Sequence, residues 1–255
     1  MRFFKEFLNG IYCYHKAIVF NRTHGLWKYY WLPFALSLLA YLFLAIGFWV
    51  LGGSLVNALE HRLAPYLLTE QKWLTWLTWF TKLLLRFLIL LFYYKIYRYL
   101  MLILLSPALA SLAEKVQVIL NKKENDGNLK KFIHDFLRGL KISFSALFYE
   151  LLISFTLMGL SLLFPLLSLV FGICIFLNEA YFVGLAMIDY RNEFEGISVT
   201  ESQKIAFKRI GFCMGNGLIC NLAMFIPFFG VAMPLLSVVA AGIGIEELEK
   251  NNQKK

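Results

Sequence analysis

The sequence predicts an all-helical, polytopic integral membrane protein with two transmembrane helices and two membrane-inserted helical hairpins. Of its 255 residues, 60% are hydrophobic and only 16% are charged, whereas soluble domains average about 45–50% apolar and about 25% charged residues. Aromatic residues make up 17% of the chain, and the apolar residues form long uncharged runs. A soluble fold of this size cannot bury so much apolar surface. Soluble enzymes, disordered proteins and disulfide-rich scaffolds are therefore excluded.

The net charge of +9, from 25 basic and 16 acidic residues, does not indicate a nucleic-acid partner. In nucleic-acid binders the basic residues gather on one water-facing surface. Here they flank the apolar runs, which is typical of cytoplasmic loops beside lipid headgroups. The predicted partner is therefore the lipid bilayer.

Residues 1–30 are predicted to form an interfacial amphipathic segment. Phe4, Phe7, Leu8 and Ile11 fall on one face of a helix. Such a helix can lie along the membrane surface with its apolar face toward the lipid.

Two transmembrane helices are predicted in the first half of the chain. Residues 31–56 carry no charge over 26 positions, and about 20 suffice to cross the hydrocarbon core. Residues 73–120 form one long helix that contains the second span. A cytoplasmic loop at 121–141 follows, because residues 114–141 hold seven basic and four acidic side chains. The first 30 residues hold five basic and one acidic side chain, so the positive-inside rule also places the N-terminus in the cytoplasm.

A hydrophobic block at residues 142–188 is long enough for either a hairpin or two full spans, and we assign it as a membrane-inserted hairpin. It is followed by a charged segment at 189–209, which we place in the cytoplasm because its basic side chains precede the next apolar run.

The last apolar block, residues 210–245, has 36 uncharged positions. Two spans of about 20 residues and a turn do not fit this length, so we predict a re-entrant hairpin that enters the membrane partway and returns. Its tip is expected at Pro227, Gly230 and Pro234. Residues 246–255 form a charged tail, and residues 1–250 as a whole are predicted to form one membrane domain with both termini cytoplasmic.

The segment around Gly25 is a candidate anion-binding site. Thr23 can cap a helix, and Gly25 lets backbone N–H groups approach a ligand closely. Lys28 adds a point charge, without the two-pronged geometry of arginine. The alternative is a simple turn at Gly25, with Lys28 extending to the membrane interface. Arg86 is a further candidate, which either faces a cavity and attracts an anion or extends to the interface.

Glu150 and Glu179 are the predicted intramembrane carboxylates. Charge within the bilayer is costly, so such residues usually form pairs or lie on proton and ion pathways. Both are candidates for proton relay in a coupled transporter. The alternative is structural: Glu150 pairs with Lys141 or Lys82, and Glu179 lies near an interface beside Asn178.

The sequence holds no Walker loop, no HExxH and no GxSxG motif, and its four histidines are scattered. We therefore expect no enzyme activity, no metal site and no cofactor.

The chain resembles the CysZ-type sulfate permease family, whose domain is shared with etoposide-induced membrane proteins of the endoplasmic reticulum. Four stretches carry the resemblance, in the order found in the family: Gly25–Tyr29 followed by Pro33, Ser106–Val116 (SPALASLAEKV), Asp189-Tyr190, and Ile226–Gly230 with Pro234 running into Ala240-Ala241-Gly242. The chain has Trp27 where the family has arginine, Arg191 where it has proline and Gly230 where it has asparagine.

The resemblance implies a permease that imports sulfate, sulfite or a related oxyanion for sulfate assimilation and cysteine biosynthesis. It implies residence in a bacterial inner membrane and assembly as a homo-oligomer. It also places the anion at Gly25, Leu26, Trp27 and Lys28. The alternative function is that of a non-transporting membrane scaffold that shapes the bilayer.

Overall fold

A computed structural model describes residues 2–121 apart from 32, 36, 37, 40, 41, 43–45, 47–53 and 55–71, together with 129–224, 226 and 229–253. Every regular element in these residues is a helix, which confirms the predicted all-helical class for this part of the chain. The elements are α1 (Arg2–Thr23), η1 (Leu26–Tyr30), α4 (Lys72–Asn121), α5 (Leu129–Leu163), η3 (Pro165–Leu167), α6 (Ser168–Phe194), α7 (Val199–Lys208), α8 (Ile210–Met224) and α9 (Phe229–Gln253). The transmembrane helix predicted at 31–56 lies largely outside the described residues.

The chain divides into two compact units, residues 1–35 with 102–255 and residues 36–101. The larger unit holds α1, α5 to α9 and the C-terminal part of α4, and the smaller unit holds the N-terminal part of α4. The long helix predicted at 73–120 is present as the 50-residue α4, which continues through Pro107.

Three described helices are long and apolar enough to cross a membrane: Arg98–Asn121, Leu137–Leu163 and Pro165–Phe194. The first belongs to the long helix in which a span was predicted. The other two are the arms of the predicted 142–188 block. The chain is therefore an integral membrane protein, as its composition indicates.

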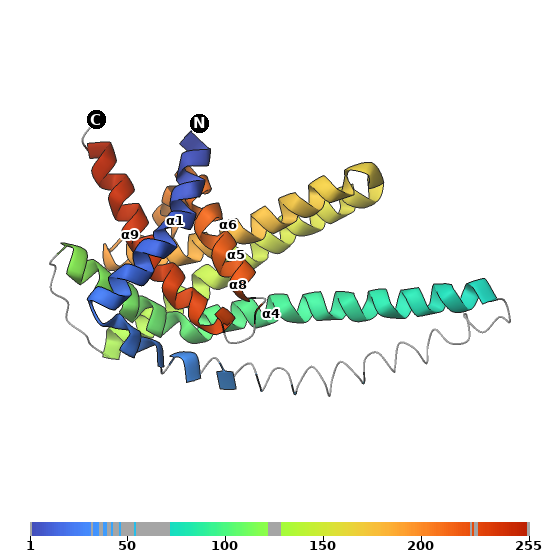
Figure 1. Ribbon diagram of the computed structural model, residues 1–255, viewed down its shortest axis with the longest axis horizontal. Helices are drawn as coiled ribbons and strands as arrows, with labels where there is room; N and C mark the ends of the chain where they lie inside the picture. The colour runs from blue at the N-terminus through green and yellow to red at the C-terminus, as the bar shows by residue number, and fades with distance from the viewer. Residues whose placement is uncertain are drawn as a thin grey trace. The chain divides into compact units, whose positions relative to one another are not determined.

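The helices α5 and α6 form an antiparallel pair joined at Phe164 and η3 (Figure 1). Large apolar side chains cover its outer surface and its tip, where Leu162 and Leu169 are each 78% exposed and Leu166 is fully exposed. In the most apolar 18-residue stretch of each helix, only 17% of the residues of α5 and 22% of those of α6 are buried. Such a surface is stable against lipid rather than water.

Three predicted boundaries differ from the observed ones. The loop predicted at 121–141 is helical from Leu129, because α5 extends beyond the apolar block and its Arg138 pairs with Asp189 of α6. The segment predicted at 189–209 contains the end of α6 and all of α7. The charged tail at 246–255 continues α9 as helix to Gln253, where its glutamates form ion pairs.

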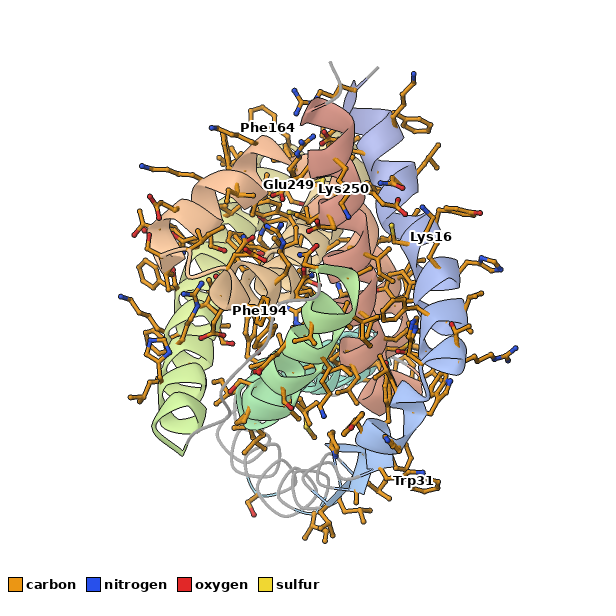
Figure 2. The ribbon with its side chains drawn as sticks, turned by 90° about the vertical axis from the view of Figure 1, so that its left-hand side faces the viewer. Lys16, Trp31, Phe164, Phe194, Glu249 and Lys250 are labelled. Atoms are coloured by element: carbon orange, nitrogen blue, oxygen red, sulfur yellow. The ribbon has the colours of Figure 1, made fainter. Side chains whose placement is uncertain are left out.

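Helix α1 is present, and its large apolar residues face away from the protein. Phe4 is 63% exposed and Leu8 is 50% exposed, whereas Gly10 and Ala17 are buried. The buried face of α1, which also includes Tyr14, packs against α8 and α9. Lys16 of α1, labelled in Figure 2, forms an ion pair with Glu247 of α9 at 2.7 Å. The outer apolar face is what an interfacial helix needs for contact with lipid.

Helix α8 packs between α1 and α6, and glycines make this close approach possible. A Cβ at Gly215 would collide with the carbonyl of Phe7 in α1. On the other side, a Cβ at Gly217 would collide with the carbonyl of Ala180 in α6. Helices in lipid associate largely by such backbone packing, since the surrounding chains are as apolar as leucine.

The variant Gly217→Ala should lower the stability of the protein by about 1–3 kcal/mol, because the added methyl group forces two backbones apart. The matched control is Gly159→Ala in α5, where nothing lies within 4 Å of the added atom, and here alanine should stabilise the helix by up to about 1 kcal/mol. Thermal unfolding in detergent measures both. Equal midpoints for the two variants would contradict the packing argument.

Candidate functional site

The predicted anion-binding segment is a tight turn that ends α1. Gly25 has φ +63°, a left-handed conformation that favours glycine. The hydroxyl of Thr23 donates to the carbonyl oxygens of Val19 (2.6 Å) and Phe20, so it completes the last turn of α1 and does not cap the next helix. The predicted capping role of Thr23 is therefore wrong, because its hydroxyl is used within its own helix.

The turn is anchored on its inner side and open on its outer side. Leu26 is 3% exposed and Tyr30 is 6% exposed, and the amide of Asn21 donates to the Tyr30 hydroxyl at 2.7 Å. Trp27, by contrast, is 42% exposed, and Lys28 is exposed. The backbone thus holds these two side chains outward, where they are accessible to a ligand.

Two lysines converge on Tyr29, between the anchored and the open side of the turn. The ammonium of Lys28 lies 5.3 Å from the centre of the Tyr29 ring, and that of Lys115, from α4, lies 3.7 Å from it. Lys115, as a hydrogen-bond donor and as a charge, lowers the pKa of the Tyr29 phenol, and Lys28 lowers it further. The turn therefore carries two positive charges near one ring, a local field that attracts anions.

The carboxylates predicted within the membrane lie in a buried polar cluster between α5, α6 and α8. Glu150 has no exposed surface and Glu179 is 9% exposed. The amide of Asn178 donates to the backbone carbonyl of Glu150 at 3.3 Å, and the amide of Asn221 donates to the carboxylate of Glu179 at 3.5 Å. The structure thus brings together the helical turns that carry Glu150 and Glu179, although 29 positions separate these residues in the sequence.

The last hairpin turns between Met224 and Phe229. Gly230 is buried at this turn, where a Cβ would come within 2.6 Å of the Met224 Cα, and its N–H donates to the Ile226 carbonyl at 2.8 Å. Pro227 lies outside the described residues. Pro234 lies inside α9 and not at the turn, which corrects the predicted tip: the chain has already re-entered a helix five residues earlier.

Arg86 is a residue of α4, and its side chain lies outside the described part of the structure. Its predicted role stays a prediction. Among the described residues there is no group of three or more histidine, cysteine, aspartate or glutamate side chains that could hold a metal ion.

Charged side chains join the helices where they leave the apolar region. Arg138 of α5 binds both carboxylate oxygens of Asp189 in α6, at 2.8 and 3.1 Å. Arg191 donates to Glu246 and Glu249 of α9, at 3.1 Å in each case. Burial raises the pKa of Glu246, but hydrogen bonds from Arg191 and Asn121 and the charge of Arg191 lower it by more, so the net pKa lies below its usual 4.5. Glu246 therefore stays ionised at neutral pH.

Two residues of these clusters have no counterpart among the predicted site residues. Lys115 was one of many basic residues around a loop, and Asn221 is an uncharged residue in an apolar run. The signal for Asn221 was present, because a polar side chain within an uncharged membrane segment tends to bind another helix. Nothing local to Lys115 indicates its contact with a residue 86 positions earlier.

Comparison with known proteins identifies the family of the chain. Residues 13–234 match the model of the family described as Sulfate transporter CysZ/Etoposide-induced protein 2.4. No curated protein matches the chain. Since the match covers most of the sequence, the chain belongs to this family.

The pKa of Tyr29 should lie below its usual value of 10. Lys115→Gln should raise it more than Lys28→Gln does, because Lys115 is the larger cause of the shift. Carbon-13 NMR of ring-labelled tyrosine measures this titration, with Tyr29→Phe to assign the signal. The prediction fails if the Tyr29 signal titrates identically in the wild type and in Lys115→Gln.

Proposed function

We propose that this member of the sulfate transporter CysZ/etoposide-induced protein 2.4 family is a membrane permease that imports sulfate or a related oxyanion such as sulfite. The observation that carries the proposal is the convergence of Lys28 and Lys115 on Tyr29. Family membership supports anion transport in general. The two lysines supply the positive charge at the turn that the resemblance associates with the anion.

In this proposal the anion lies against Gly25, Leu26, Trp27 and Lys28, with Lys115 as an added ligand. The backbone of Gly25 and Leu26 offers N–H groups, Trp27 shields one side from water, and the lysines neutralise the charge. Arg86 remains a second candidate for binding an anion. The imported sulfate would feed sulfate assimilation and cysteine biosynthesis across a bacterial inner membrane, with both termini cytoplasmic and the protein acting as a homo-oligomer.

A specific observation favours a second function. The tip of the α5–α6 hairpin is apolar and exposed, with Phe164 at 54% and Leu166 at 100% exposure. Such a tip can act as a wedge in the bilayer, as a non-transporting membrane scaffold requires. Uptake of labelled sulfate, sulfite and phosphate into proteoliposomes separates the two functions, since a flat result for every anion would favour the scaffold.

Lys28→Ala and Lys115→Gln should each reduce labelled sulfate uptake about fivefold, the effect of losing about 1 kcal/mol at a largely exposed charged contact. Lys5→Ala is the matched control, because Lys5 is exposed on α1 and is not part of the turn. Uptake that responds equally to all three variants would indicate a general effect of surface charge and would refute the site.

Glu150→Gln and Glu179→Gln should abolish any stimulation of sulfate uptake by a proton gradient, because the amide cannot take up a proton as the buried carboxylate can. Both amides keep the size of the side chain. Glu247→Gln in α9, which lies outside the cluster, should leave the response intact. The proton pathway is refuted if the carboxylate variants keep the full response.

A further inference from the structure

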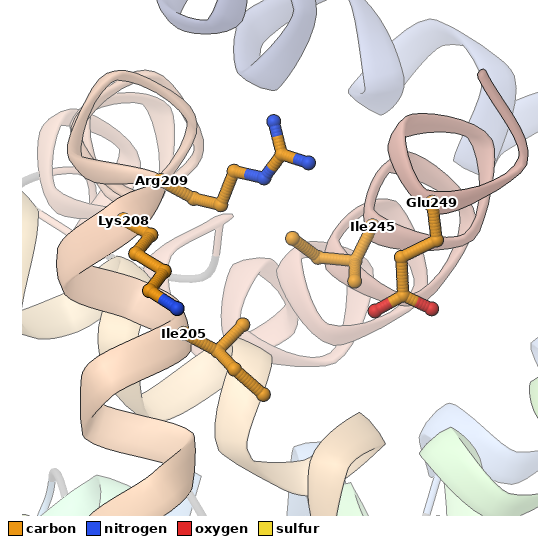
Figure 3. Close-up of a pocket in the computed structure, with 5 residues that line it drawn as sticks. All are labelled: Ile205, Lys208, Arg209, Ile245 and Glu249. Carbon is orange, nitrogen blue, oxygen red and sulfur yellow. The ribbon is translucent and has the colours of Figure 1, made fainter. Parts of the chain in front are cut away.

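A pocket of about 180 Å³ opens where α7 and α8 meet the C-terminal half of α9 (Figure 3). Its lining consists of Ile205, Lys208, Arg209, Ile245 and Glu249. The pocket is about six times the ~30 Å³ that one water molecule occupies in the liquid. It can therefore hold a hydrated polyatomic ion.

Two basic side chains that line this pocket have N–H donors that could bind a ligand. Lys208 is exposed, and Figure 3 shows its ammonium beside Ile205, on the side of the pocket opposite Glu249. No carboxylate pairs with Lys208 in the described ranges. Arg209 is 12% exposed at its side chain and uses Nη1 to bind Glu6. A guanidinium has five N–H donors, and within the described structure this is the only hydrogen bond that the Arg209 side chain makes.

The carboxylate in the lining does not cancel these charges. Glu249 is held by two N–H groups of Arg191, so its own charge is already compensated. Glu6 is shared between Arg209 and Arg2, and Glu246 between Arg191 and Lys250. The immediate surroundings therefore carry more positive than negative charge.

The surroundings also contain apolar side chains that line the pocket beside the cations, and aromatic rings nearby that are exposed. Ile205 and Ile245 line the pocket, and Phe207, next to Lys208, is 69% exposed. Gly211 at the start of α8 lies against the backbone of Phe3, whose side chain is 50% exposed. Basic groups beside exposed aromatic rings are typical of the headgroup region of a membrane.

We propose that this pocket binds a tetrahedral oxyanion through Lys208 and Arg209. The occupant that its surroundings favour is the phosphate of an anionic phospholipid headgroup, and free phosphate or sulfate shares the same chemistry. The lysine provides a mobile point charge and the arginine a fixed one, positioned by Glu6. Ile205 and Ile245 form the apolar part of the lining. The site does not depend on the proposed transport function.

The test uses the full chain purified in detergent and three probes: dioleoyl phosphatidylglycerol, dioleoyl phosphatidylcholine and inorganic sulfate. Native mass spectrometry measures lipid binding, and isothermal titration calorimetry measures sulfate binding. Lys208→Gln should weaken binding of phosphatidylglycerol about fivefold, the effect of one basic residue at an anionic membrane surface. The matched control is Lys204→Gln, which is exposed one turn earlier on α7 and does not line the pocket.

A loss with Lys208→Gln and none with Lys204→Gln supports the site with a lipid occupant. A Lys208-dependent affinity for sulfate without one for phosphatidylglycerol supports the site with a free oxyanion. Equal losses in the two variants, or binding of both lipids that neither variant changes, would overturn the proposal. Sulfate uptake by Lys208→Gln in phosphatidylcholine vesicles tests transport separately, so failure of one proposal is distinguishable from failure of the other.

Discussion

The close approach of α8 to α1 and α6 is the constraint on which the larger unit depends. Lipid chains solvate apolar side chains as well as other helices do, so apolar surface alone cannot hold helices together in a membrane. Glycines remove the side chains that would keep the backbones apart, and the gain is dense packing plus short polar contacts. Asn216 and Ser237 of α8 and α9 bond to each other at 2.8 Å, while Tyr14 of α1 donates to the Asn216 carbonyl at 2.7 Å. These bonds form only because the helices lie so close.

The same constraint determines which side chains lie between the helices of the larger unit and which lie on its surface. Small and polar side chains occupy the closest helix contacts, apolar ones such as Leu105 and Phe212 fill the core around them, and others such as Phe155 and Leu162 face outward. Ionic contacts concentrate where helices leave the apolar region, as with Arg138 and Asp189, where the buried carboxylate has an opposite charge beside it. The side chains of Glu150 and Glu179 depart from this pattern, because they are ionisable groups in the interior, where charge is costly. That departure is why they are candidates for a functional role.

Composition and charge patterning were sufficient to predict the helical class, the long helix at Lys72–Asn121 and the order of the apolar blocks. Periodicity was sufficient to predict a helix at the N-terminus, and Phe4 and Leu8 do face away from the protein. It was not sufficient to predict that α1 would also contact α8 and α9, because the contact face combines small residues such as Gly10 with polar ones such as Asn21, which carry little hydrophobic signal. The Gly-x-x-x-Gly spacing of Gly211 and Gly215 was the available signal. The contact of Lys115 with Tyr29 depends on tertiary structure and has no local signature.

The resemblance places Trp27 where the family has arginine, and the structure brings a second cation, Lys115, to the same turn. A guanidinium binds an oxyanion through two parallel donors and so selects its shape, whereas ammonium groups act as point charges. Lys28 and Lys115 supply comparable positive charge from two different helices, with Tyr29 between them. The proposed site would therefore attract doubly charged oxyanions by charge and select among them less strictly by geometry. Any selection among oxyanions at the proposed site would then come from the backbone of the turn at Gly25, whose left-handed conformation fixes where the N–H groups of η1 point.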